Sequence, residues 1–136
     1  SEAQKHAGAS IKHDISVPIS RIPEFLAQAG AMLAGSVPGI RVVPFGHLGD
    51  GNLHYNMNAP VGMPDAEFAA LAPAIQRQVH ELVHAFDGSI SAEHGLGQVK
   101  RDEAERLKSE VELDLMRAVK RAIDPEGRMN PGKVLS

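Results

Sequence analysis

The sequence contains no cysteine, which excludes disulfide bonds and thiolate metal sites and leaves His, Asp, Glu and Asn as candidate metal ligands. It also lacks an excess of positive charge. The net charge is −3, so nothing in the composition points to nucleic acid or to an anionic membrane surface as a partner. No apolar run is long enough to span a membrane, and no signal-peptide pattern opens the sequence. We therefore expect a cytoplasmic protein without a transmembrane segment.

The composition that is present is typical of a globular protein, with 43% hydrophobic and 23% charged residues. A length of 136 residues suits one domain with its own hydrophobic core. We therefore expect a single domain over residues 1–136. Its first residues, "SEAQKHAGASIKHD", resemble the interior of a longer chain rather than a beginning.

Hydrophobic periodicity predicts strands that alternate with helices. The strands are expected over residues 9–17, 40–48, 53–58 and 87–93. The helices are expected over residues 20–33, 68–86, 98–108 and 111–123. This order predicts an α+β fold, namely a ferredoxin-like split βαβ antiparallel sheet with two additional C-terminal helices.

The stretch "VPFGHLGDGNLHYN", residues 43 to 56, carries a strong hairpin signal. If Asp50 and Gly51 are the two central turn residues, His47 and His54 lie directly opposite each other, with Cβ atoms roughly 4.5–5.5 Å apart. Two imidazoles at that spacing can share a metal ion, and Asn56 lies on the same face. The alternative is two surface histidines beside a turn, because a slip of one residue would place them on opposite faces.

A second polar cluster lies in "SAEHGLG", residues 91 to 97. Its glycines allow the backbone to leave the strand alternation, so Glu93 could complete a two-histidine, one-carboxylate metal site with an open fourth position. His94 would then remain as a general base. The alternative is an ordinary corner between a strand and a helix.

Three further features have simpler interpretations. "HELVH", residues 80 to 84, matches the zinc-protease helix motif, but its histidines lie opposite the apolar face of their helix, and we expect them to face solvent. His6 and His13 are interpreted as surface residues. Lys12 is either a solvated lysine or a cation for an anionic substrate.

Taken in order, "GHLGDGNLHYN", "SAEHGLG" and "DPEGRMNPGKVL" resemble the C-terminal domain of the FAD-linked oxidases. This group belongs to the vanillyl-alcohol oxidase superfamily and includes the glycolate oxidase subunit and the D-lactate and D-2-hydroxyglutarate dehydrogenases. The resemblance implies that His47, His54 and Glu93 hold a divalent metal, zinc or manganese, and that His94 is the catalytic base.

The resemblance also implies the remaining binding roles. Lys12 and Asn56 would bind the carboxylate and hydroxyl of a small anionic 2-hydroxy acid, and Asn130 and Lys133 would lie toward the flavin of FAD. The implied reaction passes the hydroxyl proton to His94 and a hydride from C2 to the flavin.

The family's FAD-binding domain is missing from this sequence. We therefore expect an excised domain or a truncated gene product that is inactive alone, with an orphaned apolar face that could drive homo-oligomerisation. Two other hypotheses stay open at this point. One is a stand-alone metal-dependent hydrolase, and the other is a non-catalytic ferredoxin-like binding module.

Overall fold

The structure is a computed structural model that describes residues 8–136. It divides into two compact units, of which the first extends to His94 and the second is Gly95–Ser136. His6 lies outside the described residues. Within residues 8–136, no helix combines the length and the apolar character needed to cross a bilayer.

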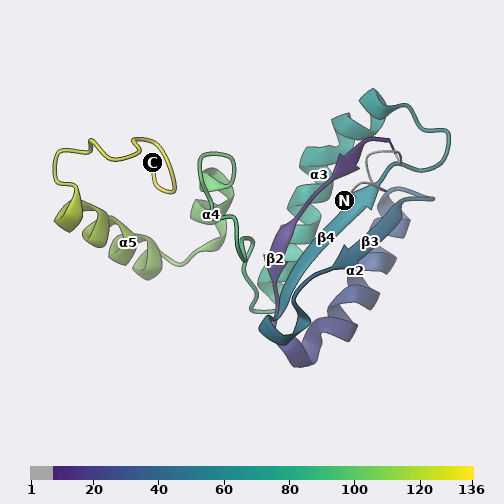
Figure 1. Ribbon diagram of the computed structural model, residues 1–136, viewed down its shortest axis with the longest axis horizontal. Coiled ribbons are helices and arrows are strands. Elements are labelled where there is room, and N and C mark those ends of the chain that lie inside the picture. The colour runs from purple at the N-terminus through teal and green to yellow at the C-terminus, as the bar shows by residue number, and fades with distance from the viewer. Residues whose placement is uncertain (1–7) are drawn as a thin grey trace. The chain divides into compact units, whose positions relative to one another are not determined.

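The first unit is built on an antiparallel sheet in which β4 is central (Figure 1). β1 and β2 pair with one edge of β4, and β3 pairs with the other. The sheet is formed by β1 (Ser10–Ile11), β2 (Asp14–Ser16), β3 (Arg41–Phe45) and β4 (Asn52–Asn58). The first predicted strand therefore neighbours the third, which neighbours the second, as a split βαβ fold requires. The α+β class is confirmed.

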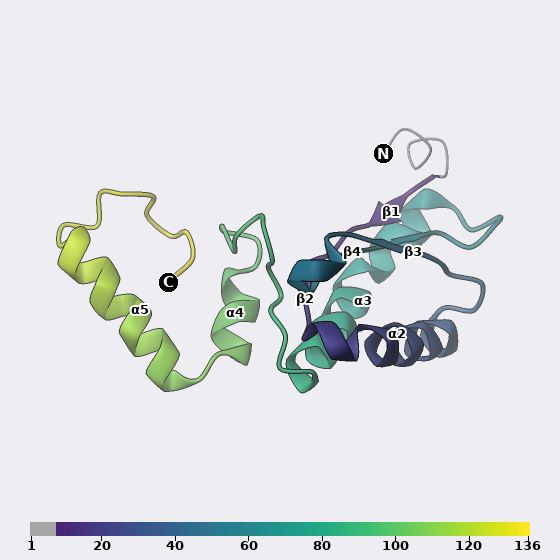
Figure 2. The same ribbon diagram turned by 60° about the horizontal axis from the view of Figure 1, so that its bottom comes forward.

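Two helices, α2 (Ile22–Ser36) and α3 (Asp65–Ala85), cover one face of this sheet (Figure 2). Odd-numbered residues of β4 point toward them, and Leu53, Tyr55 and Met57 are at most 1% exposed. The Phe25 ring of α2 lies edge-on to Tyr55, with ring centroids 5.6 Å apart. Burial of such side chains stabilises the fold by about 1.5–3 kcal/mol each. No helix among the described residues of this unit covers the opposite face of the sheet, which carries the even-numbered residues of β4 (Figure 2).

Two predicted strands differ from the structure. The strand over residues 9–17 is present as two short pieces, β1 and β2, separated at Lys12 and His13. The prediction of a strand over residues 87–93 is wrong, because this segment forms only one antiparallel bridge, between Ser16 and Ser89. Beyond this bridge, the backbone amides of residues 92–94 donate to the Asp14 carboxylate instead of to a neighbouring strand.

The histidines at two other positions are buried, not solvent-facing. His13 is 3% exposed and His80 is 6% exposed, and their rings meet edge-on with centroids 5.6 Å apart. His13 shares the inward face of its strand with Ile11 and Ile15, because alternate strand residues point the same way. His80 neighbours Val79 on α3, whose buried face is wider than its apolar stripe. The prediction holds for His84, which is exposed.

The second unit contains the two predicted C-terminal helices, α4 (Arg101–Leu107) and α5 (Glu110–Ile123). A capping box begins α5, since Ser109 Oγ accepts from the Glu112 amide while the Glu112 carboxylate accepts from the Ser109 amide and hydroxyl. These hydrogen bonds lower the pKa of Glu112 to about 2. After α5, the buried Asp124 carboxylate accepts the amides of Arg128 and Met129, both at 2.8 Å, and fixes the following turn.

Candidate active site

The candidate site lies on the sheet face that the helices leave open. The register aligns three side chains in one row across the sheet, Asp14 of β2, His54 of β4 and Phe45 of β3. Directly paired residues point to the same face, so this row belongs to the open side of the sheet. Continuing the same register aligns Lys12 with Asn56 in the neighbouring row.

The predicted hairpin register is wrong by two residues, because Phe45 and not His47 pairs with His54. Leu48–Asp50 forms a single 3-10 turn, and Gly51 follows in the left-handed region at φ 74°. A two-residue turn of the predicted kind needs positive φ at both central positions, which Asp50 does not adopt. His47 therefore lies in the turn and not on the strand.

The turn that carries His47 is fixed by backbone contacts. The His47 carbonyl accepts from the amides of Asp50 at 3.0 Å and Asn52 at 3.2 Å. Gly46 has φ 155°, and a Cβ there would lie closer than 3.0 Å to the carbonyl oxygen of Asn52. Only glycine allows the two backbone segments to approach so closely. The orientation of His47 thus depends on Gly46.

The two predicted histidines meet at the carboxylate of Glu93. His47 Nδ1 lies 2.9 Å from Glu93 Oε1, and His54 Nε2 lies 3.7 Å from Glu93 Oε2. Asn52 Nδ2 also donates to Glu93 Oε1. The structure brings the predicted trio together by tertiary packing and not by the hairpin register that suggested it.

His94 lies beside this trio. Its ring stacks on the His54 ring with centroids 5.8 Å apart, while Phe45 contacts His54 at 5.1 Å. His94 Nδ1 is 3.7 Å from the buried Asp14 Oδ2. The His94 side chain is 68% exposed, so its imidazole is accessible to a small molecule that reaches the open face.

Among the described residues, the side chains that offer ligand atoms within 4.8 Å of one another are those of Asp14, Glu93 and His94. The predicted set of His47, His54 and Glu93 is more open, although both histidines approach the Glu93 carboxylate. Imidazole and carboxylate donors suit Zn²⁺ or Mn²⁺ in either set.

Lys12 and Asn56 share the open face with these groups. Lys12 is exposed between β1 and β2, and Asn56 is 5% exposed on the central strand. The ammonium group of Lys12 and the amide of Asn56 belong to residues at paired positions of the continued register. Together they can bind the two oxygens of a carboxylate, or a carboxylate and a hydroxyl group of one ligand. Their substrate-binding roles stay a prediction.

Sequence reasoning missed two residues of the site. Asn52 holds the Glu93 carboxylate, and Asp14 holds the backbone of the same segment. The even spacing of Asn52, His54 and Asn56 was the available signal for the first. No local signal marks Asp14, whose partners lie 78 to 80 residues away in the sequence.

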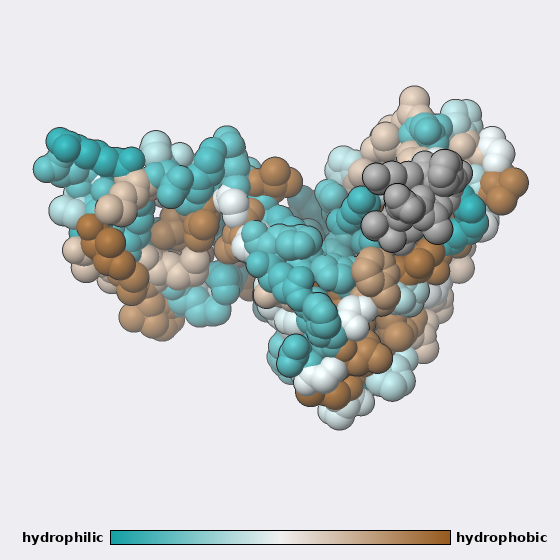
Figure 3. All heavy atoms as spheres, in the orientation of Figure 1, coloured by the Kyte–Doolittle hydropathy of each residue, from teal (hydrophilic) through white to brown (hydrophobic). Residues whose placement is uncertain are grey.

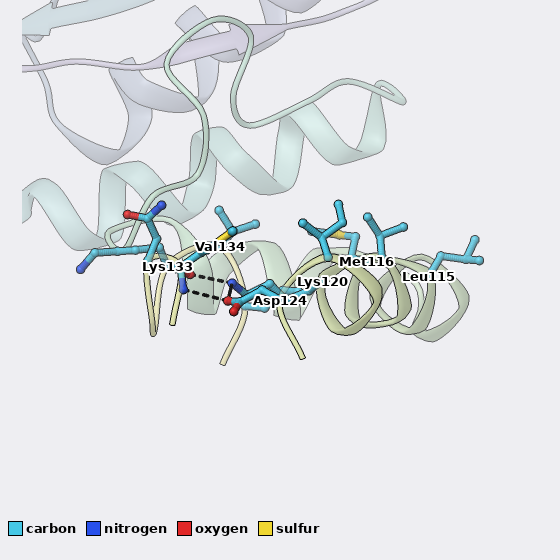
Figure 4. A pocket seen from close by; sticks show the side chains of 11 residues that line it. Leu115, Met116, Lys120, Asp124, Lys133 and Val134 are labelled. Atoms are coloured by element: carbon cyan, nitrogen blue, oxygen red, sulfur yellow. Dashed lines mark hydrogen bonds and ion pairs between the residues drawn. The ribbon is translucent and has the colours of Figure 1, made fainter. Parts of the chain in front are cut away.

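Asn130 and Lys133 belong to the second unit and line an apolar groove of about 730 Å³ (Figure 4). Lys133 Nζ donates to Gln98 Oε1 at 2.7 Å, and Asn130 has φ 47°. The groove follows the apolar face of α5, where the space-filling view shows exposed hydrophobic side chains (Figure 3). That face is formed by Val111, Leu115, Val119 and Ile123, each at least 58% exposed.

Three known proteins to which this chain is similar share one name. The chain is 44% identical over 125 residues to a D-2-hydroxyglutarate dehydrogenase of Stutzerimonas stutzeri, which covers 92% of this chain and 27% of that protein. A D-2-hydroxyglutarate dehydrogenase of Xanthomonas citri is 44% identical over 123 residues, 90% of this chain and 26% of its own length. The mitochondrial D-2-hydroxyglutarate dehydrogenase of Danio rerio is 40% identical over 134 residues, 98% of this chain and 24% of its own length.

The chain thus spans about a quarter of the length of these curated relatives. The family described as "FAD linked oxidases, C-terminal domain" matches residues 1–134, almost the whole chain. The protein belongs to the family of FAD-linked oxidase C-terminal domains.

Proposed function

We propose that this chain is the substrate- and metal-binding domain of an FAD-dependent dehydrogenase that oxidises a D-2-hydroxy acid or glycolate to the 2-oxo acid. The carrying observation is the convergence of His47 and His54 on the Glu93 carboxylate, with His94 stacked beside them. Relatives named D-2-hydroxyglutarate dehydrogenase make D-2-hydroxyglutarate the first substrate to test.

The residues present fit a divalent cation, since two imidazole nitrogens approach the two oxygens of one carboxylate. We propose His47, His54 and Glu93 as the ligands. A bound Zn²⁺ or Mn²⁺ would supply a Lewis acid that acidifies the substrate hydroxyl and anchors its carboxylate. Asn52 keeps Glu93 turned toward the histidines through its hydrogen bond to Oε1.

The remaining side chains would accept the substrate proton and bind the substrate carboxylate. His94 Nδ1 faces the Asp14 carboxylate, so Nε2 is the nitrogen that would accept the hydroxyl proton. Lys12 would pair with the substrate carboxylate, and Asn56 would donate a hydrogen bond to a substrate oxygen. FAD, bound mainly by a domain outside this chain, would supply the acceptor for the hydride from C2.

We further propose that Asn130 and Lys133 contact the flavin-bearing partner. The apolar face of α5 would then be covered by the FAD-binding domain or, in its absence, by a second copy of this chain. The cytoplasmic location also stays a prediction, because the names of some relatives, among them the Danio rerio protein, include "mitochondrial".

The test is metal content by elemental analysis after incubation with Zn²⁺ or Mn²⁺ and removal of excess metal. We expect about one metal per chain in the wild type and almost none in the His47→Ala/His54→Ala double variant, because two of three ligands are lost. His84→Ala is the matched control, since this exposed histidine of α3 lies outside the site.

Metal retained by the double variant would contradict the ligand assignment. Turnover of esters or amides by the metal-loaded chain without flavin would favour the hydrolase instead. For the substrate class, titration of the loaded chain with D-2-hydroxyglutarate, D-lactate and glycolate should show binding that Lys12→Met weakens. Equal binding by Lys12→Met would remove the lysine from the substrate site.

A further inference from the structure

The carboxylate of Asp14 is almost completely buried, with 4% of the residue exposed, while the segment above it is open to solvent. Asp14 Oδ2 accepts the backbone amides of Ala92 at 3.1 Å, Glu93 at 3.0 Å and His94 at 2.8 Å. The hydroxyl of Ser91 lies 3.4 Å from the same oxygen. The buried side chain of Asp14 therefore accepts hydrogen bonds from every residue of the segment 91–94.

These hydrogen bonds replace the strand pairing that the segment lacks. After the single bridge at Ser89, residues 91–94 have no ladder partner among the described strands. Hydrogen bonds from amides to an ionised carboxylate are stronger than those between neutral groups. A buried carboxylate is tolerated only where such partners compensate for its desolvation. The segment and Asp14 thus depend on each other.

The position of Asp14 decides where the segment is held. Asp14 is the direct partner of His54 in the sheet register. Anchoring at this point places the Glu93 carboxylate against His47 and His54, and it places the His94 ring on the His54 ring. Neither Glu93 nor His94 is held there by burial, since their side chains are 41% and 68% exposed.

We propose that Asp14 is the positioning residue of the site: it holds Glu93 and His94 in place through their backbone amides and is not itself a metal ligand. Its Oδ2, the atom nearest to His94, already accepts three amides, so a cation would have to displace them. The consequence for metal affinity rests on the function proposed above. The anchoring itself does not, because it concerns the metal-free chain.

The primary measurement is amide hydrogen exchange by NMR on the metal-free wild-type chain. The amides of Glu93 and His94 lie in exposed residues, and without an acceptor they would exchange at the rate of an unstructured peptide. We expect exchange at least about tenfold slower than that rate. Exchange at the unstructured rate would overturn the proposal without any variant being made.

The variant Asp14→Asn keeps the size of the side chain and removes its charge. We expect it to return the two amides toward the unstructured rate and to weaken Zn²⁺ binding by about 10–100-fold, the usual effect of losing a residue that orients a ligand. The matched control is Asp65→Asn, whose carboxylate accepts the amide of Ala9 at 2.9 Å in another part of the sheet unit. It should leave both readouts unchanged.

The outcomes separate the two proposals. Loss of all Zn²⁺ binding in Asp14→Asn with the amides still protected would make Asp14 a ligand and overturn its positioning role. Protected amides in a wild-type chain that binds no Zn²⁺ would support the anchoring and count against the proposed function. If Asp14→Asn fails to fold, the exchange rates of the Glu93 and His94 amides in the wild-type chain remain the test of the anchoring.

Discussion

The turn that carries His47 provides a sharp test of the site, through the substitution Gly46→Ala. The added methyl group would lie closer than 3.0 Å to the carbonyl oxygen of Asn52 and 3.1 Å from Leu53 Cα, both backbone atoms of the central strand. These atoms cannot move aside as a flexible side chain would. The φ of 155° at Gly46 also belongs to a region that other residues adopt only with strain.

The expected loss of stability in Gly46→Ala follows from the backbone strain and the steric clash. Residues forced into sparsely populated backbone conformations cost about 1–3 kcal/mol, and overpacking costs about 1–3 kcal/mol. Because one backbone shift relieves part of both, we expect the free energy of unfolding to fall by about 2–4 kcal/mol. That shift displaces the next residue, His47, so the affinity for Zn²⁺ should fall as well.

The assay is denaturant unfolding of the chain together with a Zn²⁺ titration. Gly49→Ala is the matched control, because it lies in the same loop at ordinary φ with nothing within 4 Å of the added methyl group. It should change the free energy of unfolding by no more than about 0.5 kcal/mol. Equal effects of the two substitutions on stability would refute the close approach at Gly46.

Two further predictions concern packing and titration. Phe25→Ala removes a fully buried ring that contacts both Tyr55 and Phe86, so the free energy of unfolding should fall by about 3–5 kcal/mol in the same denaturant assay; a loss below about 1 kcal/mol would contradict this core. Glu112 has a pKa of about 2, below its ordinary value of 4.5, because the Ser109 amide and hydroxyl stabilise its ionised form. Its stabilisation of α5 is therefore present above pH 4.5 and lost as the pH falls toward 2. A pH titration of helicity by circular dichroism should show this acid loss in the wild type and a smaller one in Glu112→Gln.

The sequence predicted the helices well because helical periodicity is local. The apolar residues Phe25, Ala29 and Leu33 recur at a spacing of four and are buried in α2 as expected. The sheet order also followed from the sequence of elements, because few topologies satisfy a βαββα pattern. The predictions for His13 and His80 were wrong because the buried faces of the first strand and of α3 extend beyond their apolar residues, and the two rings pack against each other there.

The sequence predicted that His47, His54 and Glu93 lie together, but it did not predict how they meet. The motifs around His47, His54 and Glu93 identified the trio, and the alternation of β4 placed His54 and Asn56 on one face. The hairpin register was wrong because the backbone at Gly46 and Gly51 admits a longer turn than the Asp-Gly pair indicates. Local turn preferences differ by little energy, so contacts with the rest of the sheet decide between them.

The sequence by itself thus determined the family and the α+β order of elements, and it supplied the prediction of which side chains act as ligands and base, because these depend on residue type and short spacing. Only the tertiary structure decided how these side chains meet. Glu93 reaches His47 across 46 residues, and Asp14 reaches the amide of His94 across 80. No local pattern encodes such contacts, because they form only when the sheet and the segment after α3 are packed together.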